Sequence, residues 1–171
     1  MRPILAALLL VTALRAQVAS RHLKVAPGAD IPITIIQGRR PGPTLALVAG
    51  IHGYEYTPIL ALQRVRANLS PEALSGTVIL VHVANLPSFL KRTIYYGPDG
   101  GKNLNRVFPS RPDGALSERI AHVLTAEVIE KADYLIDLHC GDGNESLRPY
   151  SYWMRTGWPS ASRTSSSTTS S

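Results

Sequence analysis

Three continuous apolar runs divide the chain into alternating segments. The runs are TLALVAG at residues 44–50, GTVILVHVAN at 76–85 and DYLIDLHCG at 133–141. Unbroken apolar runs of this length are typical of strands that are buried on both faces of a parallel sheet. Upstream, residues 22–38 predict two more strands around the Pro27–Gly28 turn, and residues 39–44 predict a loop that leads into the first run.

Helical periodicity fills the intervals between these runs. Residues 57–70 repeat apolar side chains at helical spacing after Thr57 and Pro58, which suit an N-cap and a first turn. Residues 115–132 predict a second, amphipathic helix whose apolar face is made of Leu116, Ile120, Leu124 and Val128. Strand and helix therefore alternate, and the chain is predicted to be an α/β domain with a mostly parallel or mixed sheet flanked by helices.

A long polar connection, residues 86–114, separates the second apolar run from the second helix. It is rich in Gly, Pro and Asn, so regular structure is not expected throughout it. Loops of that length in a compact domain are usually functional. We therefore expect this segment to take part in function.

Two histidines are predicted to meet at one edge of the sheet. His52 and His139 each follow an apolar run, and Gly53 and Gly141 limit backbone crowding beside them. Ligands of open parallel sheets collect beyond the carboxyl ends of the strands, where both imidazoles would lie. Glu55, about one helical turn past His52, can supply a third ligand. Two histidines and a carboxylate around an open fourth position form the ligand set of catalytic zinc.

Spacing alone leaves a second interpretation open, in which the H-x-x-E residues cap a helix and the later histidine belongs to the core. His82, inside an apolar run, and His122, within the second helix, are interpreted as structural. Cys140 is the only cysteine, so the chain forms no internal disulfide. At the end of an apolar run, Cys140 is interpreted as small buried filler rather than as a nucleophile or a ligand.

The motifs AGIHGYEY, NLNRVFP and IDLHCG occur in this order at residues 49–56, 103–109 and 136–141. Together they resemble the succinylglutamate desuccinylase and aspartoacylase family of the zinc carboxypeptidase superfamily, and the resemblance covers roughly residues 40–153. It implies that His52, Glu55 and His139 bind one Zn²⁺ ion. It also implies a zinc carboxypeptidase-like fold that is incomplete at its C-terminal end.

The same resemblance implies roles in substrate binding and catalysis. Asn105 and Arg106 would bind the carboxylate of the substrate, and an arginine fork beside an amide donor suits a planar anion. Arg92 matches the arginine that in relatives polarises the scissile carbonyl and stabilises the developing oxyanion. Asp137, two residues before His139 and on the same strand face, would either orient that ligand or make an ordinary buried hydrogen bond.

The implied reaction is hydrolysis of an acyl-amide or ester bond in a small anionic substrate that resembles an N-acyl amino acid. A zinc-activated water would attack the acyl carbon, and a carboxylate would serve as general base and then as acid. In relatives this glutamate comes much later than Glu145, so the chain is expected to be C-terminally truncated. Two alternatives stay open: a noncatalytic metal-binding or ligand-binding remnant, and a secreted metallocarboxypeptidase that acts on peptides.

The first residues carry the pattern of a secretory signal peptide. Residues 1–16 combine an early Arg2 with an apolar run from Ile4 to Leu14, which is too short for a membrane span. The protein is therefore expected to be secreted or periplasmic, with no stable membrane span after cleavage. Loss of Arg2 and Arg15 lowers the formal net charge from +6 to +4, and the remaining basic residues are scattered, so no nucleic-acid partner is expected.

The final residues depart from a globular composition. Residues 155–171 are mostly Ser and Thr without hydrophobic periodicity, and they are predicted to be disordered. We interpret this tail as the product of a shifted or truncated reading frame near Met154. A single zinc-hydrolase domain is predicted for residues 21–154, since 171 residues are too few for two ordinary domains.

Overall fold

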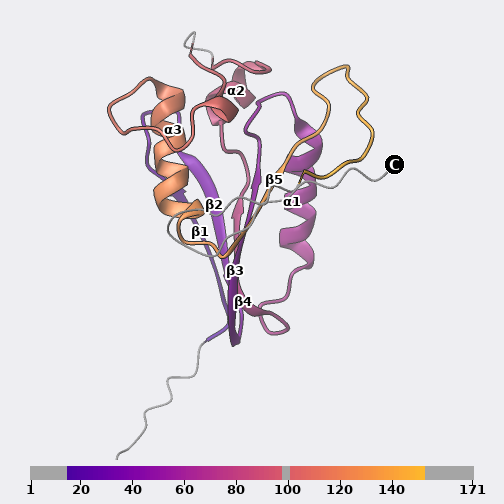
Figure 1. Ribbon diagram of the computed structural model, residues 1–171. Coiled ribbons are helices and arrows are strands. Elements are labelled where there is room, and N and C mark those ends of the chain that lie inside the picture. The colour runs from indigo at the N-terminus through magenta and orange to yellow at the C-terminus, as the bar shows by residue number, and fades with distance from the viewer. Residues whose placement is uncertain (1–14, 98–100, 153–171) are drawn as a thin grey trace, which may run out of the picture.

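The computed structural model describes residues 15–97 and 101–152, which form a five-stranded sheet between helices (Figure 1). The strands lie in the order β1-β2-β4-β3-β5. Their bounds are Gln17–Leu23 for β1, Ile31–Gln37 for β2, Arg40–Ala49 for β3, Ser75–Val81 for β4 and Tyr134–Leu138 for β5. β2 is antiparallel to both β1 and β4, whereas β3, β4 and β5 run parallel to one another. The predicted mixed α/β fold is confirmed.

Two predictions fall on residues that the structure does not describe. The signal peptide at residues 1–16 lies almost wholly outside the described part of the chain, and the Ser/Thr-rich tail at 155–171 lies entirely outside it. Both stay predictions. Within residues 15–97 and 101–152, no helix is long and apolar enough to cross a membrane.

The β-α-β unit predicted around the first helix is present. β3 leads into α1, Tyr56–Asn68, and α1 returns the chain to β4, which pairs in parallel with β3. α1 lies on one face of the sheet and buries Pro58, Ile59 and Leu62, whereas Leu60 is exposed. Helical apolar spacing therefore produces a buried stripe, although the exposed Leu60 lies outside it.

A second helix covers the opposite face of the sheet (Figure 1). α3, Leu116–Leu124, continues as the π-helical turn η2, Thr125–Ile129. The side chains that this pair buries include Ile120, Ala121, Leu124 and Val128. The predicted amphipathic helix is thus confirmed, with a change of helical geometry near its end.

β3 begins earlier than predicted, because most of residues 39–44 belong to the strand. The loop prediction for this segment is wrong from Arg40 onward. The strand accommodates Pro41 and Pro43 because its pairing with β4 shifts register between Arg40 and Thr44. A proline-rich stretch can therefore belong to a strand where an irregular register does not require every residue to donate a backbone hydrogen bond.

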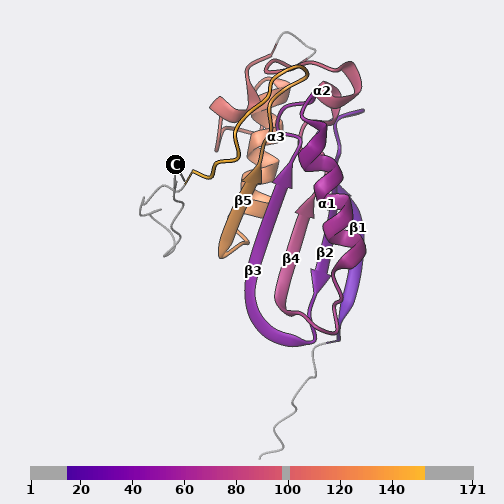
Figure 2. The same ribbon diagram turned by 90° about the vertical axis from the view of Figure 1, so that its right-hand side faces the viewer.

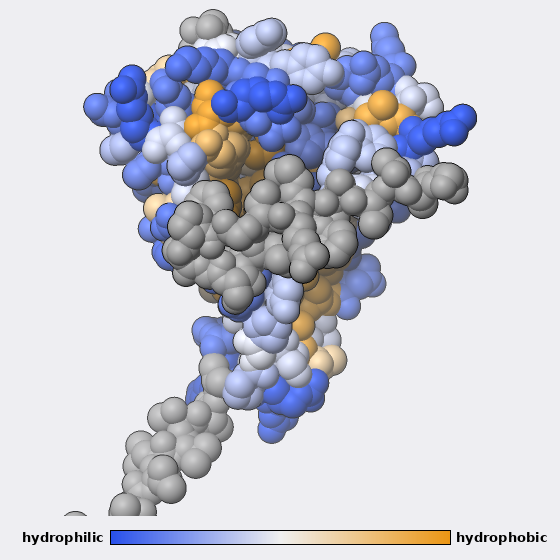
Figure 3. Space-filling model, in the orientation of Figure 1, coloured by the Kyte–Doolittle hydropathy of each residue, from blue (hydrophilic) through white to orange (hydrophobic). Residues whose placement is uncertain are grey.

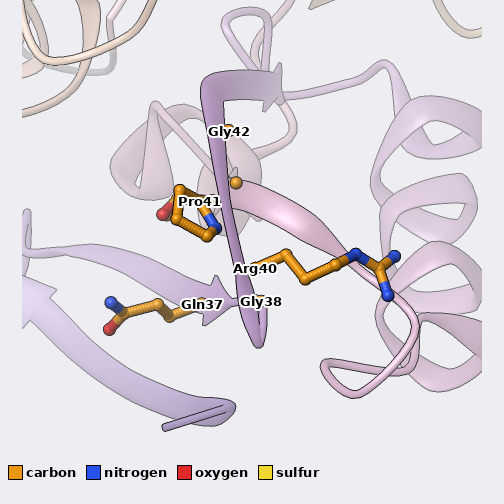
Figure 4. Close-up of a pocket in the computed structure, with 7 residues that line it drawn as sticks. Gln37, Gly38, Arg40, Pro41 and Gly42 are labelled. Carbon is orange, nitrogen blue, oxygen red and sulfur yellow. The ribbon is translucent and has the colours of Figure 1, made fainter. Parts of the chain in front are cut away.

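A hollow lies at the amino-terminal end of β3, away from the carboxyl ends of the strands. It is lined by Gln37, Gly38, Arg40, Pro41, Gly42, Gly76 and Thr77 (Figure 4). Figure 4 shows the Arg40 side chain directed away from Gln37. The Arg40 guanidinium donates to Ser75 Oγ and to the Ala73 carbonyl oxygen, both at 2.8 Å. These bonds fasten β3 beside the start of β4.

β5 is not a buried strand, contrary to the prediction from its apolar run. Its residues Tyr134, Leu135 and Ile136 are 61%, 43% and 48% exposed. Figure 2 shows β5 at one edge of the sheet beside β3, and Figure 3 shows apolar side chains exposed among hydrophilic ones. An apolar run indicates that its side chains favour burial, but it does not show that another layer of the fold covers them. Within the described residues, β3 is the only strand that pairs with β5.

Candidate metal centre

The carboxyl ends of two parallel strands bring His52 and His139 together. Ala49 of β3 pairs with Leu138 of β5 where both strands end. His139 follows Leu138 directly, and His52 follows Ala49 after a turn through Gly50, whose φ of 73° lies in the region that favours glycine. The two imidazole centroids are 5.0 Å apart. The structure thus brings together the two histidines that the sequence pattern places at this edge.

Glu55 lies between the two imidazoles. Its Oε1 is 2.7 Å from Nδ1 of His52, and its Oε2 is 2.9 Å from Nδ1 of His139. Glu55 and His52 are 4% and 6% exposed, whereas the His139 side chain is 27% exposed, so the group opens to solvent on the His139 side. The Cys140 amide also donates to Glu55 Oε2, at 3.1 Å. Cys140 therefore contributes its backbone to the site.

The start of α1 differs from the prediction, since the helix begins at Tyr56 and its N-cap is Glu55 rather than Thr57. The Glu55 side chain makes no capping hydrogen bond. Both of its oxygens are instead engaged by His52, His139 and the Cys140 amide. The interpretation of Glu55 as a helix-capping side chain is therefore wrong. The helix start directs this carboxylate into the histidine pair.

The donor atoms of this group fit a zinc ion. One nitrogen or oxygen atom from each of His52, Glu55 and His139 lies within 4.8 Å of the others. Tetrahedral zinc binds such atoms at about 2.0–2.2 Å, which holds them about 3.3–3.6 Å from one another. Small side-chain shifts would give that separation. Two neutral imidazoles and a carboxylate are also a donor set that zinc prefers.

Each imidazole has an oxygen acceptor on its far side. Nε2 of His139 lies 2.9 Å from Oδ2 of Asp137, and Nε2 of His52 lies 3.2 Å from Oδ1 of Asn103. If Nε2 of a neutral imidazole carries the proton at such a contact, Nδ1 keeps its lone pair for a metal. The Asp137 contact has the geometry that an orienting role requires, and that role stays a prediction. Asn103 is not recognisable in that role from sequence, although it opens the NLNR motif.

Opposite charges share this group in the metal-free chain. Burial raises the pKa of Glu55, but hydrogen bonds from His139 and His52 outweigh burial and lower that pKa to about 2. Burial lowers the pKa of His139, but hydrogen bonds to Asp137 and Glu55 outweigh burial and raise that pKa to about 10. Glu55 is therefore ionised and His139 protonated at neutral pH. A metal ion has to displace the His139 proton in order to bind.

These two shifts predict that the metal-free protein is most stable between about pH 4.5 and pH 6.5. The lowered pKa of Glu55 contributes stability above its unfolded pKa, and this contribution is lost as the pH falls toward 2. The raised pKa of His139 contributes stability below its unfolded pKa, and this contribution is lost as the pH rises toward 10. Denaturant unfolding with a chelator present measures the profile. Glu55→Gln should flatten its acidic side, and an unchanged acidic side would contradict this origin.

α2, Leu86–Lys91, packs tightly against the turn that carries His52. A Cβ atom on Gly53 would lie 2.1 Å from the carbonyl carbon of Ser88, so only glycine fits there. Arg92 is the C-cap that follows α2, and its backbone is left-handed with a φ of 54° while its side chain is exposed. The connecting segment is therefore partly regular. The role of Arg92 at the scissile carbonyl stays a prediction.

The 3-10 turn η1, Leu104–Arg106, carries the predicted substrate residues. Leu104 is fully buried and anchors the turn, while Asn105 is half-buried and Arg106 is exposed. The Asn105 amide donates to Oδ1 of Asn103 at 2.9 Å. The same oxygen faces His52, in the turn after β3, so Asn103 connects the metal centre to η1. The binding of a substrate carboxylate by Asn105 and Arg106 stays a prediction.

Tyr95 is a further neighbour of the site, and no sequence signal marks it. Its ring meets the His52 imidazole edge-on, with centroids 5.1 Å apart and ring planes at 89°. Its hydroxyl is hydrogen-bonded to Asp142, which raises the pKa of Tyr95. Both residues lie in irregular segments, where neither helical nor strand periodicity can identify contacts.

The remaining histidines of the sequence pattern lie elsewhere. β4 ends at Val81, so His82 follows the strand instead of lying inside it. His82 Nε2 is 2.9 Å from Thr34 Oγ1, and burial lowers the pKa of His82. His122 lies on α3. Among the described residues, the group that could hold a metal ion consists of His52, Glu55 and His139.

Residues 41–156 match the model of the succinylglutamate desuccinylase/aspartoacylase catalytic domain. The chain is 39% identical over 122 residues to the N-alpha-acetyl-L-2,4-diaminobutyric acid deacetylase of Halomonas elongata, a match that covers 70% of this chain and 34% of that protein.

Two solved structures extend the likeness to the fold. A succinylglutamate desuccinylase/aspartoacylase from Rhodobacter sphaeroides superimposes with a TM-score of 0.69 and 28% identity, over 77% of this chain and 42% of that one. The product-bound ectoine utilization protein EutE (DoeB) from Ruegeria pomeroyi gives a TM-score of 0.66 and 31% identity, over 77% and 42% of the two chains. The chain thus spans less than half the length of these proteins.

Proposed function

Since the chain belongs to the succinylglutamate desuccinylase/aspartoacylase family, we propose that it is a zinc-dependent deacylase that hydrolyses the acyl-amide bond, or an ester bond, of a small N-acyl amino acid. The observation that carries this proposal is the group of His52, Glu55 and His139 beyond the ends of two parallel strands. The Halomonas elongata relative is named as a deacetylase of N-alpha-acetyl-L-2,4-diaminobutyric acid, which supports this substrate class.

Zinc would be held by Nδ1 of His52, Nδ1 of His139 and a carboxylate oxygen of Glu55. The ion supplies Lewis acidity and lowers the pKa of water toward neutrality. Asp137 and Asn103 hold the two imidazoles by their Nε2 atoms, so that both rings are already turned toward Glu55. A preset donor geometry reduces the ordering that metal binding requires.

The substrate would approach from the side on which the group is exposed. Arg106 and Asn105 on η1 would bind its carboxylate, since a guanidinium beside an amide suits a planar anion. Arg92, exposed at the end of α2, would face the acyl carbonyl oxygen and stabilise the charge that develops there. Export to the periplasm or the medium is part of the proposal and rests on the sequence of residues 1–16.

A zinc-binding domain without hydrolytic activity is the second candidate. The group of His52, Glu55 and His139 is present in the described residues, but metal ligation alone does not supply the general base of the reaction. Loss of a general acid or base commonly costs about 10²–10⁴ in rate. The two candidates therefore differ measurably in turnover while sharing the metal.

The zinc-loaded chain is expected to release free amino acid from N-alpha-acetyl-L-2,4-diaminobutyric acid, which amine-specific derivatisation and chromatography would measure. Arg106→Ala should raise KM by about tenfold or more with a smaller change in kcat, because it removes a charged substrate contact. Arg111→Ala is the matched control, since Arg111 is exposed and pairs with Asp113. Release of C-terminal residues from peptides instead would identify a peptidase. Zinc binding without release of either product would favour the noncatalytic domain.

A further inference from the structure

Tyr95 touches the metal centre from the connection between α2 and η1. Its ring edge packs against the His52 imidazole with centroids 5.1 Å apart and planes at 89°, which is a favourable aromatic arrangement. The other side of Tyr95 faces solvent, because the residue is 42% exposed. The side chain of Tyr95 therefore contacts His52 on one side and solvent on the other. It lies in the segment that begins with Arg92.

Asp142 binds the hydroxyl end of Tyr95. The residue is 8% exposed, and its side chain is hydrogen-bonded to the Tyr95 hydroxyl. Asp142 lies three residues after His139, in the loop that follows β5. Its carbonyl oxygen accepts a hydrogen bond from the Glu145 amide at 2.8 Å. A buried carboxylate on a hydrogen-bonded turn is a fixed anchor for the tyrosine.

The loop that carries Asp142 is itself packed on the turn between His52 and Glu55. Gly143 has a φ of 50°, and a Cβ atom there would lie 2.2 Å from Cε1 of Tyr54. Only glycine allows that approach. Tyr54 therefore supports this loop from the β3 side. Tyr95 contacts both parts of the arrangement: the imidazole after β3 by its ring, and the loop after β5 by its hydroxyl.

We propose that Tyr95 is a positioning residue that clamps His52 and, through Asp142, ties the Arg92 segment to the loop behind His139. The clamp sets the spacing between two ligands that come from different strands, and it holds the connecting segment beside them. This inference rests on the proposed function for its purpose. Its geometry is that of the protein chain alone, so it can be measured in the absence of metal and substrate.

A substitution on either side of the Tyr95–Asp142 hydrogen bond should change amide hydrogen exchange on the other side. The measurement uses the metal-free full chain. Tyr95→Phe should speed exchange at Cys140 and Glu145 by about 3- to 10-fold, the range expected for loss of one hydrogen bond. Asp142→Ala should speed exchange at Thr93, whose amide bonds to the Ser88 carbonyl oxygen. Asp142→Asn, which keeps an acceptor, should restore most of the protection. If neither substitution changes exchange across the contact, the clamp does not exist.

The ring contact has its own measurement in the side-chain resonances of His52. Tyr95→Ala should shift these resonances, because the aromatic ring no longer lies 5.1 Å away, whereas Tyr95→Phe should leave them nearly unchanged. Tyr96→Ala is the matched control, since Tyr96 is the next residue and is 65% exposed. Equal shifts in Tyr95→Ala and Tyr96→Ala would overturn the positioning role. Absence of deacylase activity with these results intact would count against the proposed function alone.

Discussion

Alanine at His52 or at His139 is expected to abolish stoichiometric zinc binding by the purified chain. Each substitution removes one of the three donors that lie within 4.8 Å of one another. Loss of a group that merely orients a ligand typically lowers metal affinity about 10- to 100-fold, and loss of a ligand should exceed that range. Zinc per chain, measured by elemental mass spectrometry after dialysis, gives the stoichiometry. Competition with a chromogenic chelator gives the affinity.

His82→Ala and Glu55→Gln sharpen this experiment. His82 pairs with Thr34 and lies outside the group, so His82→Ala should keep full zinc content. Glu55→Gln keeps the size of the side chain but removes the charge, and it should weaken zinc binding as strongly as the histidine substitutions. One zinc ion per chain in both histidine variants would show that the ligand assignment is wrong. Equal loss in His82→Ala would point to unfolding.

Asn103→Ala is expected to lower zinc affinity by about 10- to 100-fold and also to loosen the turn that carries the predicted substrate residues. The reason is that one side-chain oxygen faces His52 Nε2 at 3.2 Å and accepts the Asn105 amide at 2.9 Å. Its removal frees the imidazole to rotate and leaves a helix-end amide without its partner. Chelator competition measures the first effect. Hydrogen exchange of the Asn105 amide measures the second.

Asp137→Ala separates the two effects. Asp137 contacts Nε2 of His139 at 2.9 Å and lies on β5, away from η1. It should therefore weaken zinc binding by a similar factor without changing exchange of the Asn105 amide. Asn103→Asp keeps an acceptor oxygen and should restore both properties. If Asn103→Ala altered Asn105 exchange but left zinc affinity unchanged, Asn103 would be a turn cap and nothing more.

Most of the regular structure could be predicted from sequence because its periodicity is local. The unit of β3, α1 and β4 and the helix over α3 and η2 both follow from apolar spacing within a few turns. The predictions are wrong where the structure depends on how strands pair or on whether another layer covers them. Arg40 joins β3 through an irregular register with β4, and Ile136 stays exposed although its run is apolar. Neither the pairing of Arg40 nor the exposure of Ile136 can be predicted from the neighbouring residues in the sequence.

The candidate site was likewise predictable from the sequence only in part. His52 and His139 could be placed at one edge because both follow apolar runs, and parallel strands bring their carboxyl ends together. Tyr95 and Asp142 could not be placed, because each lies in irregular backbone and their contact depends on how two loops fold over the sheet. The same holds for Asn103, which is 51 positions from the imidazole it faces.

The sequence by itself determined which side chains are candidates for the chemistry: two histidines and a glutamate beside strand ends, and an Asn-Arg pair in the long polar connection that precedes the second histidine. Only the tertiary structure decided how they are held. It directs both oxygens of Glu55 to imidazole Nδ1 atoms, including that of His139, which is 84 positions away. It also supplies the outer partners of the two rings. The physical reason is that periodicity specifies local conformation, whereas these contacts depend on strand order and on the packing of loops above the sheet.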